Sequence, residues 1–271
     1  MLEDFAKALG CREDTLFAML RYVGDRSASA HYTVVAGWLA PVNLWEQMEI
    51  DWRLVLAKYD VPHFHMKEFA HSVGSFAKWR GQEGTRQNFL AELVDVISWR
   101  SLYGIACVVG QQDFEAVNRE YELLEYFKHP YVICAAQAMG LARRRKGADF
   151  PNHDIEYILE RGDPHQGRLV EICIEWGDHT PVYKRPRSGP DDGPDIDPPL
   201  IALQSADFAA WELNKAANML GPNHPLWMYR KSLQALGKRH VEWNHYSGKD
   251  LIEWCESTRL KEKVRRRAPS L

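Results

Sequence analysis

Two apolar, aromatic-rich runs begin the regular patterning of the chain. Residues 16–23 (LFAMLRYV) and 31–40 (HYTVVAGWLA) each favour a strand, and the segment GDRSASA between them has the composition of a turn. We therefore expect these two strands to form a hairpin. The pattern of residues 1–15 favours a short amphipathic helix ahead of it.

A helical pattern follows the hairpin. Between residues 41 and 60, large apolar side chains recur at alternating spacings of three and four, namely Trp45, Met48, Trp52, Val55 and Tyr59. This spacing places them on one face of a helix that packs against a core. Asn43 and Glu46, three residues apart, resemble a capping pair at the start of that helix.

Strands and helices then alternate along the chain. Apolar runs favour strands at 101–110 and 154–160 and a short one within 181–186. Helices are expected over 85–99, over 111–147 with a break near Pro130, through 171–176 and over 200–220. The Pro-, Gly- and Asp-rich segment 188–199 has loop composition. This order predicts an α/β fold with a mixed sheet, an opening hairpin and flanking helices.

The pattern shows no linker that would divide the chain into separate domains. We expect an N-terminal extension over residues 1–17, one α/β domain over 18–235, and a C-terminal extension over 236–271. The C-terminal extension is mainly helical or irregular by pattern and ends in the basic tail LKEKVRRRAPSL.

Composition and charge narrow the function classes. The chain has 271 residues, with 34 Lys and Arg against 37 Asp and Glu and a net charge of −3, which argues against a uniformly positive surface for indiscriminate duplex binding. A local basic groove is compatible with this charge. No apolar run reaches the roughly 18 residues of a membrane span, and the N-terminal residues lack a signal-peptide pattern. The five scattered cysteines form no CxxC pair, so we expect reduced thiols in a cytoplasmic protein.

Several familiar sites are excluded because their motifs are absent: the P-loop, the GxGxxG dinucleotide fingerprint, GxSxG and HExxH. Acids and histidines at predicted strand ends remain. Asp25 follows the first predicted strand, where the structural alternative is an ordinary turn aspartate. His65 and Glu68 would face each other on a helical turn, although paired loop histidines often have no special role. Glu160 ends a strand, where ligand crevices form in α/β sheets.

Asp207 gives the strongest physical signal, because it lies in the apolar helical stretch ALQSADFAAW. An ionised carboxylate enters such a face only with a partner or a metal. The structural alternative is a buried aspartate that pairs with an arginine or caps a neighbouring element. Asp25, Glu160 and Asp207 come from a first strand, a later strand and a late helix, and their convergence would suit Mg²⁺ or Mn²⁺, which prefer oxygen ligands.

Five segments in this order resemble the bacterial and phage domain-of-unknown-function 3800 family, over roughly residues 18–235. They are RYVGDRSAS leading to HYTVVAGWLAP, then PHFHMKEF, YILERGDPHQG, LQSADFAAWELNK and YRKSL. The resemblance implies a ribonuclease-H-like fold, a divalent-metal site formed by Asp25, Glu160 and Asp207, and supporting roles for Gln204 and His65. It also places the chain near phage defence or mobile elements.

The chain departs from the family pattern at the end of the first strand. Gly24 stands where the family has its first Asp, Arg26 replaces the usual Ser and Ser27 the usual Gly. This departure removes one expected carboxylate and brings a cation beside the expected metal site.

Three functional hypotheses follow. The first is a metal-dependent nuclease or phosphodiesterase, in which His65 assists proton transfer and Gln204, Arg161 and Arg26 contact substrate. Residues 143–146, Arg80 and the C-terminal tail would then contact phosphates. The alternative is a catalytically impaired ribonuclease-H-like subunit that binds nucleic acid or a partner protein. The third is a hydrolase for a small phosphorylated or other polar substrate.

Overall fold

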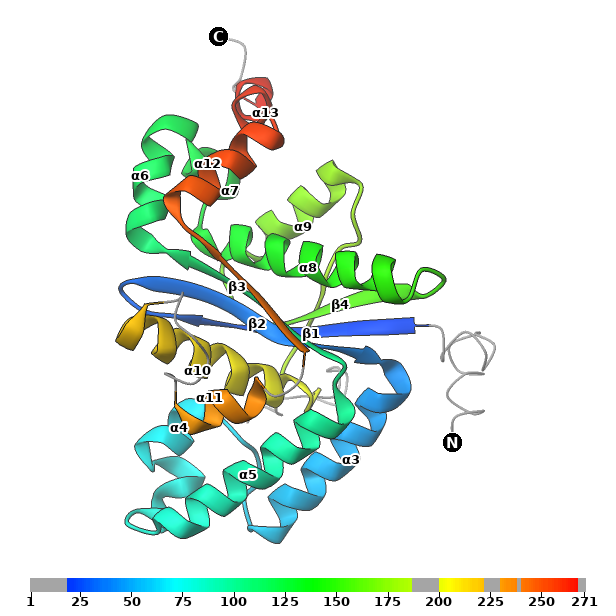
Figure 1. Cartoon of the computed structure of the whole chain (residues 1–271), viewed down its shortest axis with the longest axis vertical. Helices are drawn as coiled ribbons and strands as arrows, with labels where there is room; N and C mark the ends of the chain where they lie inside the picture. Colours follow the sequence, from blue (N-terminus) through cyan, green and yellow to red (C-terminus); the bar gives the residue numbers. More distant parts are fainter. Residues whose placement is uncertain (1–18, 187–199, 222–229, 238–239, 268–271) are drawn as a thin grey trace.

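A mixed β-sheet divides the molecule into two helical layers (Figure 1). The computed structural model describes residues 19–186, 200–221, 230–237 and 240–267. Within them the sheet has six strands in the order β5-β4-β1-β2-β3-β6. Their bounds are β1 Met19–Ala28, β2 Tyr32–Pro41, β3 Tyr103–Gly110, β4 Asp154–Glu160, β5 Val182–Lys184 and β6 His240–Tyr246.

The predicted opening hairpin is confirmed, because β1 pairs antiparallel with β2. Strand β3 extends it antiparallel to β2, whereas β4 lies parallel to β1, β5 parallel to β4 and β6 parallel to β3. The fold is therefore the α/β class with the mixed sheet expected from the sequence.

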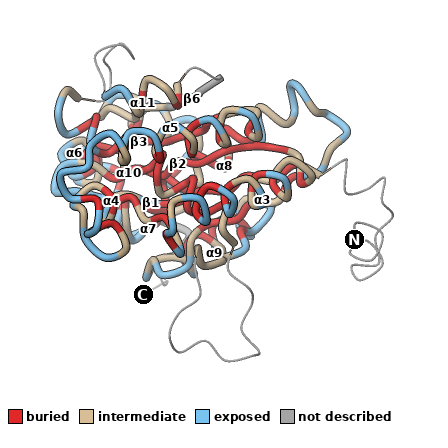
Figure 2. Tube along the Cα trace, turned by 90° about the horizontal axis from the view of Figure 1, so that it is seen from below, coloured by how far each residue is buried: buried red, intermediate tan, exposed pale blue. Residues whose placement is uncertain are grey.

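The helices cover both faces of the sheet (Figure 1). One layer, below the sheet in that view, contains α3 Val42–Lys58, α4 Met66–His71, the 3₁₀ helix η1 Gly74–Trp79, α5 Glu83–Arg100, α10 Leu203–Leu220 and α11 Lys231–Leu236. The other contains α6 Gln111–Tyr121, α7 Leu123–Phe127, α8 Pro130–Asp149, α9 Gln166–Trp176, α12 Gly248–Ser257 and α13 Leu260–Arg267. Two cores result, one on each side of the sheet, and the buried chain runs through the middle of the molecule (Figure 2).

Alternation along β1 sorts its side chains between these cores. Val23 belongs to the core on the α10 side, whereas Leu20 and Tyr22 belong to the core on the α8 side. Successive residues of a strand point to opposite faces, so odd-numbered positions of β1 face α10 and even-numbered positions face α8. This alternation fixes which acids can meet.

Some sequence expectations change locally. The face of α3 is buried at Trp45, Met48, Trp52 and Val55 as predicted, but the Asn43–Glu46 capping pair is wrong, because the helix begins after Pro41 without a side-chain cap. The predicted break near Pro130 is present, and the segment 111–147 forms α6, α7 and α8. In the described residues no helix combines the length and apolar character needed to cross a membrane.

The C-terminal extension is the larger correction. Residues 236–271 were expected to be mainly helical or irregular, and α12 and α13 agree with this, but β6 adds a strand to the sheet beside β3, from Tyr103↔His240 to Val109↔Tyr246. The domain boundary near 235 therefore cuts through the sheet. The expected N-terminal helix, the 188–199 loop and the last residues of the tail lie outside the described residues.

Candidate active site

A cavity of about 320 Å³ opens where β1 and β4 separate. Their parallel pairing ends at Gly24↔Leu159. Beyond that pair, β1 continues beside β2 to Ala28, while β4 ends at Glu160. The carboxyl ends of parallel strands that part in this way form ligand crevices. The walls of the cavity include Asp25, Arg26, His65, Tyr131, Glu160, Arg161, Asp163 and Asp207.

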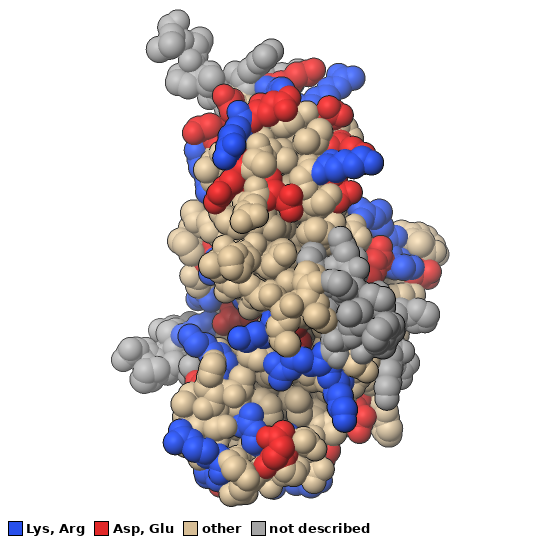
Figure 3. All heavy atoms as spheres, turned by 60° about the vertical axis from the view of Figure 1, so that its left-hand side comes forward, with Lys and Arg blue, Asp and Glu red and all other residues tan. Residues whose placement is uncertain are grey.

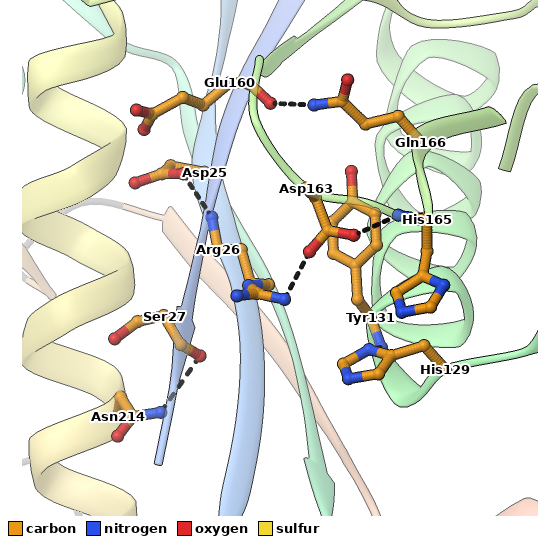
Figure 4. A network of polar contacts seen from close by, with 10 residues as sticks. All are labelled: Asp25, Arg26, Ser27, His129, Tyr131, Glu160, Asp163, His165, Gln166 and Asn214. Carbon is orange, nitrogen blue, oxygen red and sulfur yellow. Dashed lines mark hydrogen bonds and ion pairs between the residues drawn. The ribbon is translucent and has the colours of Figure 1, made fainter. Parts of the chain in front are cut away.

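Asp25 and Glu160 lie side by side in this fork. Val23 and Ile158 belong to the core on the α10 side, so Asp25 and Glu160, each two positions further along its strand, face the same way. Figure 4 shows both carboxyl groups pointing toward α10. Asp25 lies within β1, not in a turn as the sequence indicated, because residues 25–28 pair with β2. Only 8% of Asp25 is exposed.

The charge of Asp25 is poorly compensated. Burial raises its pKa well above the usual range, and the carboxyl groups of Glu160 and Asp207 raise it further. A hydrogen bond with Glu160 also favours the protonated form of Asp25. The backbone N–H of Arg26 acts in the opposite direction by donating to Oδ1 at 2.6 Å. Burial and the nearby Glu160 therefore favour the protonated form of Asp25.

Asp207 enters the cavity from the first half of α10. Burial raises its pKa to about 6, while the N–H of Met66 and the nearby His65 act to lower the pKa. Oδ2 accepts a hydrogen bond of 2.7 Å from the Met66 N–H, at the start of α4. Asp207 thus caps a neighbouring element, which was the structural alternative, and also lines the cavity with the other acids.

The two arginines expected to contact substrate line the cavity in different ways. Arg26 faces the α8 side, where it forms an ion pair with Asp163 and lies 5.9 Å from the centre of the Tyr131 ring. Figure 4 shows Asp163 between Arg26 and the backbone of His165, to which its Oδ1 is hydrogen-bonded at 2.8 Å. Arg161 is exposed at the rim.

Gln204 does not reach the cavity, so its expected role in substrate binding is corrected. It is buried, and its Oε1 accepts hydrogen bonds from Trp52 Nε1 at 3.0 Å and from the Phe64 N–H at 2.8 Å. Its Nε2 donates to the Pro186 carbonyl at 3.0 Å. The amide therefore holds the segment ahead of α4 in place, as a structural residue.

The expected phosphate contacts of residues 143–146 lie far from the cavity. Tyr131, near the start of α8, lines the cavity, and the basic cluster lies roughly 20 Å further along the same helix at 1.5 Å per residue. Arg143 pairs with Asp178 and Arg145 with Glu242. This cluster forms ion pairs on the opposite end of the helix and is not part of the cavity.

Sequence reasoning missed two wall residues, Tyr131 and Asp163. Asp163 follows Glu160 in the segment ERGD, and its position after a strand end was the available signal. Tyr131 gave no signal, because an apolar helix start was a sufficient explanation for it. Both line the cavity and contact Arg26, and no sequence spacing shows these contacts.

The chemistry of the three acids fits Mg²⁺ or Mn²⁺. All are oxygen donors, and the pKa values of Asp25 and Asp207 are raised by burial and by neighbouring carboxyl groups. A divalent cation would relieve this repulsion. In the present geometry, no three His, Cys, Asp or Glu side chains of the described residues form a ready-made ion site. Binding would require the acids to be ionised and their carboxylates to rotate toward the ion.

Comparisons with protein-family profiles, with curated proteins and with solved structures find no match for this chain. We therefore infer the function from the geometry of the cavity.

Gly24, where the resemblance expects an acid, lies on the α8 face of β1, away from Asp25. A Cβ at this position would lie 2.9 Å from the hydroxyl and ring of the buried Tyr22. We expect Gly24→Asp to lower the free energy of unfolding by about 1–3 kcal/mol, because Tyr22 must move. Denaturant unfolding measures this loss. Gly24→Ala adds the Cβ without the carboxylate, so its loss of stability gives the steric contribution alone. We expect no gain in Mn²⁺ affinity, and a tighter Mn²⁺ complex in Gly24→Asp would contradict this placement.

Proposed function

We propose that this chain is a divalent-metal-dependent nuclease or phosphodiesterase that hydrolyses phosphodiester bonds of nucleic acid. The observation that carries the proposal is the meeting of Asp25 from β1, Glu160 from the end of β4 and Asp207 from α10 in a single cavity with His65. Acids that converge in one cavity with raised pKa values are typical of a functional site, and the pKa values of Asp25 and Asp207 are raised.

Each wall of the cavity has a distinct role in this proposal. Asp25, Glu160 and Asp207 would hold Mg²⁺ or Mn²⁺, and Asp25 would release its proton when the ion binds. A bound divalent ion activates water and stabilises the charge that develops on the leaving oxygen. His65 would carry a proton at the rim. Arg161, and those donors of Arg26 that Asp163 does not occupy, would contact phosphate oxygens.

We also propose that the fold is ribonuclease-H-like and that the resemblance to the domain-of-unknown-function 3800 family is real. The supporting features are the opening hairpin extended by β3, the parallel strands β4 and β5, and acids within β1, at the end of β4 and on α10. The strand β6 is an addition at the edge of that arrangement. A role in phage defence or mobile-element biology follows only from this resemblance.

Surface charge supports a nucleic-acid substrate. On the face that includes the left-hand side of Figure 1, Lys and Arg predominate over the middle and lower part, while acids and bases mix at the top (Figure 3). Exposed basic residues on or beside the helices of the lower layer include Lys67, Arg80, Lys215, Arg230 and Lys231. Such a distribution favours phosphate contacts on this face of the molecule despite the net charge of −3.

We propose a cytoplasmic location as well. The described cysteines Cys107, Cys134, Cys173 and Cys255 are free and buried. Buried thiols without disulfides are typical of reducing compartments.

The alternative, a catalytically impaired subunit that binds nucleic acid or a protein partner, has one specific observation in its favour. Asp207 already has a structural partner in the Met66 N–H, and Asp25 has one in Glu160. These contacts partly explain, without a metal ion, why the fold can bury the two carboxyl groups. The two functions differ in what removal of the acids does: it abolishes cleavage in an enzyme, and it leaves binding intact in a subunit.

The proposal is tested by incubating the protein with labelled single-stranded RNA, single-stranded DNA, duplex and hybrid, with Mg²⁺ or Mn²⁺ or with a chelator. We expect metal-dependent cleavage of at least one substrate, lost in Asp207→Asn. No cleavage of any substrate by the folded protein would contradict the enzyme and favour the binding subunit. Cleavage of small phosphodiesters that oligonucleotides do not inhibit would favour a small-substrate hydrolase instead.

A further inference from the structure

The segment that carries His65 is fixed to α10 on both sides. The Phe64 N–H donates to Gln204 Oε1 at 2.8 Å, and the Met66 N–H donates to Asp207 Oδ2 at 2.7 Å. The residue between them has little freedom to move along the rim. Gln204 and Asp207 lie three residues apart on the helix, so one face of α10 sets the position of His65 beside the acids.

The imidazole of His65 has one buried edge and one open edge. Nδ1 is buried, yet 40% of the side chain is exposed, and the residue lines the cavity. We infer that Nε2, on the far side of the ring from Nδ1, belongs to the exposed part. The next residue, Met66, donates its N–H to Asp207, and His65 and Asp207 line the same cavity.

Glu68 lies at the buried edge of that ring. Its Oε1 is 3.4 Å from His65 Nδ1, the polar contact of this nitrogen in the described part of the chain. That separation is longer than a good hydrogen bond, and Nδ1 lacks a well-aligned partner. Contacts of catalytic groups are often long in structures without substrate and tighten when it binds.

The carboxylate of Glu68 is itself held from two further sides. Its Oε2 is 3.4 Å from His63 Nε2. Gly74 closes over it with φ of +56°, and a Cβ at Gly74 would lie only 2.7 Å from Oε2. Glycine tolerates this backbone conformation and leaves room for the carboxylate. The surroundings of Glu68 therefore restrict it to a position between the two histidines.

We propose that Glu68 is a positioning residue that accepts the Nδ1–H of His65 and so keeps the unprotonated Nε2 facing the carboxylate cavity, with His63 supporting the far side of the carboxylate. A carboxylate behind an imidazole fixes both its tautomer and its orientation. The catalytic role of His65 in this inference rests on the proposed function, whereas the placement of Glu68 rests on the contacts of residues 63–74.

In the proposed hydrolysis, His65 takes up one proton and gives one proton back. His65 Nε2 takes a proton from the attacking water as the new P–O bond forms, and the resulting imidazolium gives that proton to the leaving oxygen as the old P–O bond breaks. The imidazole returns to its neutral form with Nδ1–H still on Glu68. Glu68 does not line the cavity and acts only through His65.

The tautomer of His65 tests the proposal without any substrate or metal. Nitrogen-15 NMR of the full-length, histidine-labelled protein, at a pH where imidazole is neutral, distinguishes protonated Nδ1 from protonated Nε2. His65→Gln identifies the signals of His65. We expect protonated Nδ1 in the wild type and a shift toward protonated Nε2 in Glu68→Gln, because an amide can present its NH2 to Nδ1. Glu92→Gln, a matched change at a carboxylate bound to Lys58 and Tyr59, should leave the tautomer unchanged.

The cleavage kinetics of the variants provide a second test. We expect Glu68→Gln and His65→Gln each to lower kcat by about 10²-fold with little change in KM, and the double variant to lose no more than either single variant. Protonated Nε2 in the wild type, or a Glu68→Gln variant with wild-type tautomer and kcat, would overturn the proposal. A wild-type protein that cleaves no substrate would defeat the proposed function, while the NMR result would still decide the role of Glu68.

Discussion

Replacing Asp25 with asparagine is expected to abolish metal-dependent cleavage and at the same time to stabilise the fold at neutral pH. Asp25 is buried, and its pKa is raised by burial and by Glu160 and Asp207. Asparagine matches the protonated form: its Oδ1 can still accept from the Arg26 N–H, and its NH2 can donate to Glu160. The variant removes an unfavourable buried charge and also a ligand that the proposed ion needs.

We expect kcat to fall on the order of 10³-fold, since a charged ligand at the reacting centre is lost. We expect the free energy of unfolding at neutral pH to rise by about 1–3 kcal/mol. Denaturant unfolding with a chelator present measures the second effect, and the cleavage assay measures the first. A loss of activity together with a gain in stability is typical of a functional acid, whose buried charge destabilises the fold.

Asp51→Asn is the matched control for both measurements. Asp51 lies on α3 and pairs with Arg100 at 2.7 Å, away from the cavity. Loss of this partly exposed pair should cost no more than about 1 kcal/mol and leave cleavage unchanged. An Asp25→Asn variant that keeps metal-dependent cleavage, or that is less stable than the wild type at neutral pH, would show that Asp25 has a structural and not a functional role.

Local patterns predicted most of the fold because they are carried by neighbouring residues. The face of α3 and the strand at 154–160 follow directly from helical and strand periodicity. Asp25 was misplaced into a turn because Gly24, Arg26 and Ser27 give its surroundings turn composition. Pairing of residues 25–28 with β2 outweighs that local preference. Strand β6 was missed for a related reason, since its partner β3 lies far away in the sequence.

Some residues of the candidate site could be predicted and others could not, because tertiary contacts leave no local signal in the sequence. A carboxylate in an apolar helix indicates a special environment, and this signal found Asp207. No such signal distinguishes a glutamine that binds substrate from one that supports a loop, and Gln204 proved to do the latter. The i, i+3 spacing of His65 and Glu68 was visible, but the closure of Gly74 over the carboxylate depends on tertiary structure.

Because of these acids, the free energy of unfolding should fall as pH rises, and a bound metal ion should counteract this loss. The pKa of Asp207 rises from about 4 in an unfolded chain to about 6 in the fold, and that of Asp25 rises as well. A group whose folded pKa is raised stabilises the fold fully below its unfolded pKa, and this contribution is lost as pH rises through the folded pKa. The metal-free protein should therefore lose on the order of 2 kcal/mol from Asp207 alone between pH about 4 and pH about 7.

Mg²⁺ or Mn²⁺ should restore this stability only where the acids are ionised, because protons and the ion compete for the same carboxylates. Denaturant unfolding across pH, with saturating metal and with chelator, gives the difference directly and cancels acids of opposite behaviour such as Asp250, whose pKa is lowered by Ser247. We expect the metal-dependent difference to be near zero at pH about 4 and to grow to roughly 2–4 kcal/mol above pH about 7. Asp25→Asn and Asp207→Asn should flatten it. A difference that is equally large at both ends of the pH range would place the ion elsewhere, since only a site made of these raised carboxyl groups exchanges protons for metal in that window.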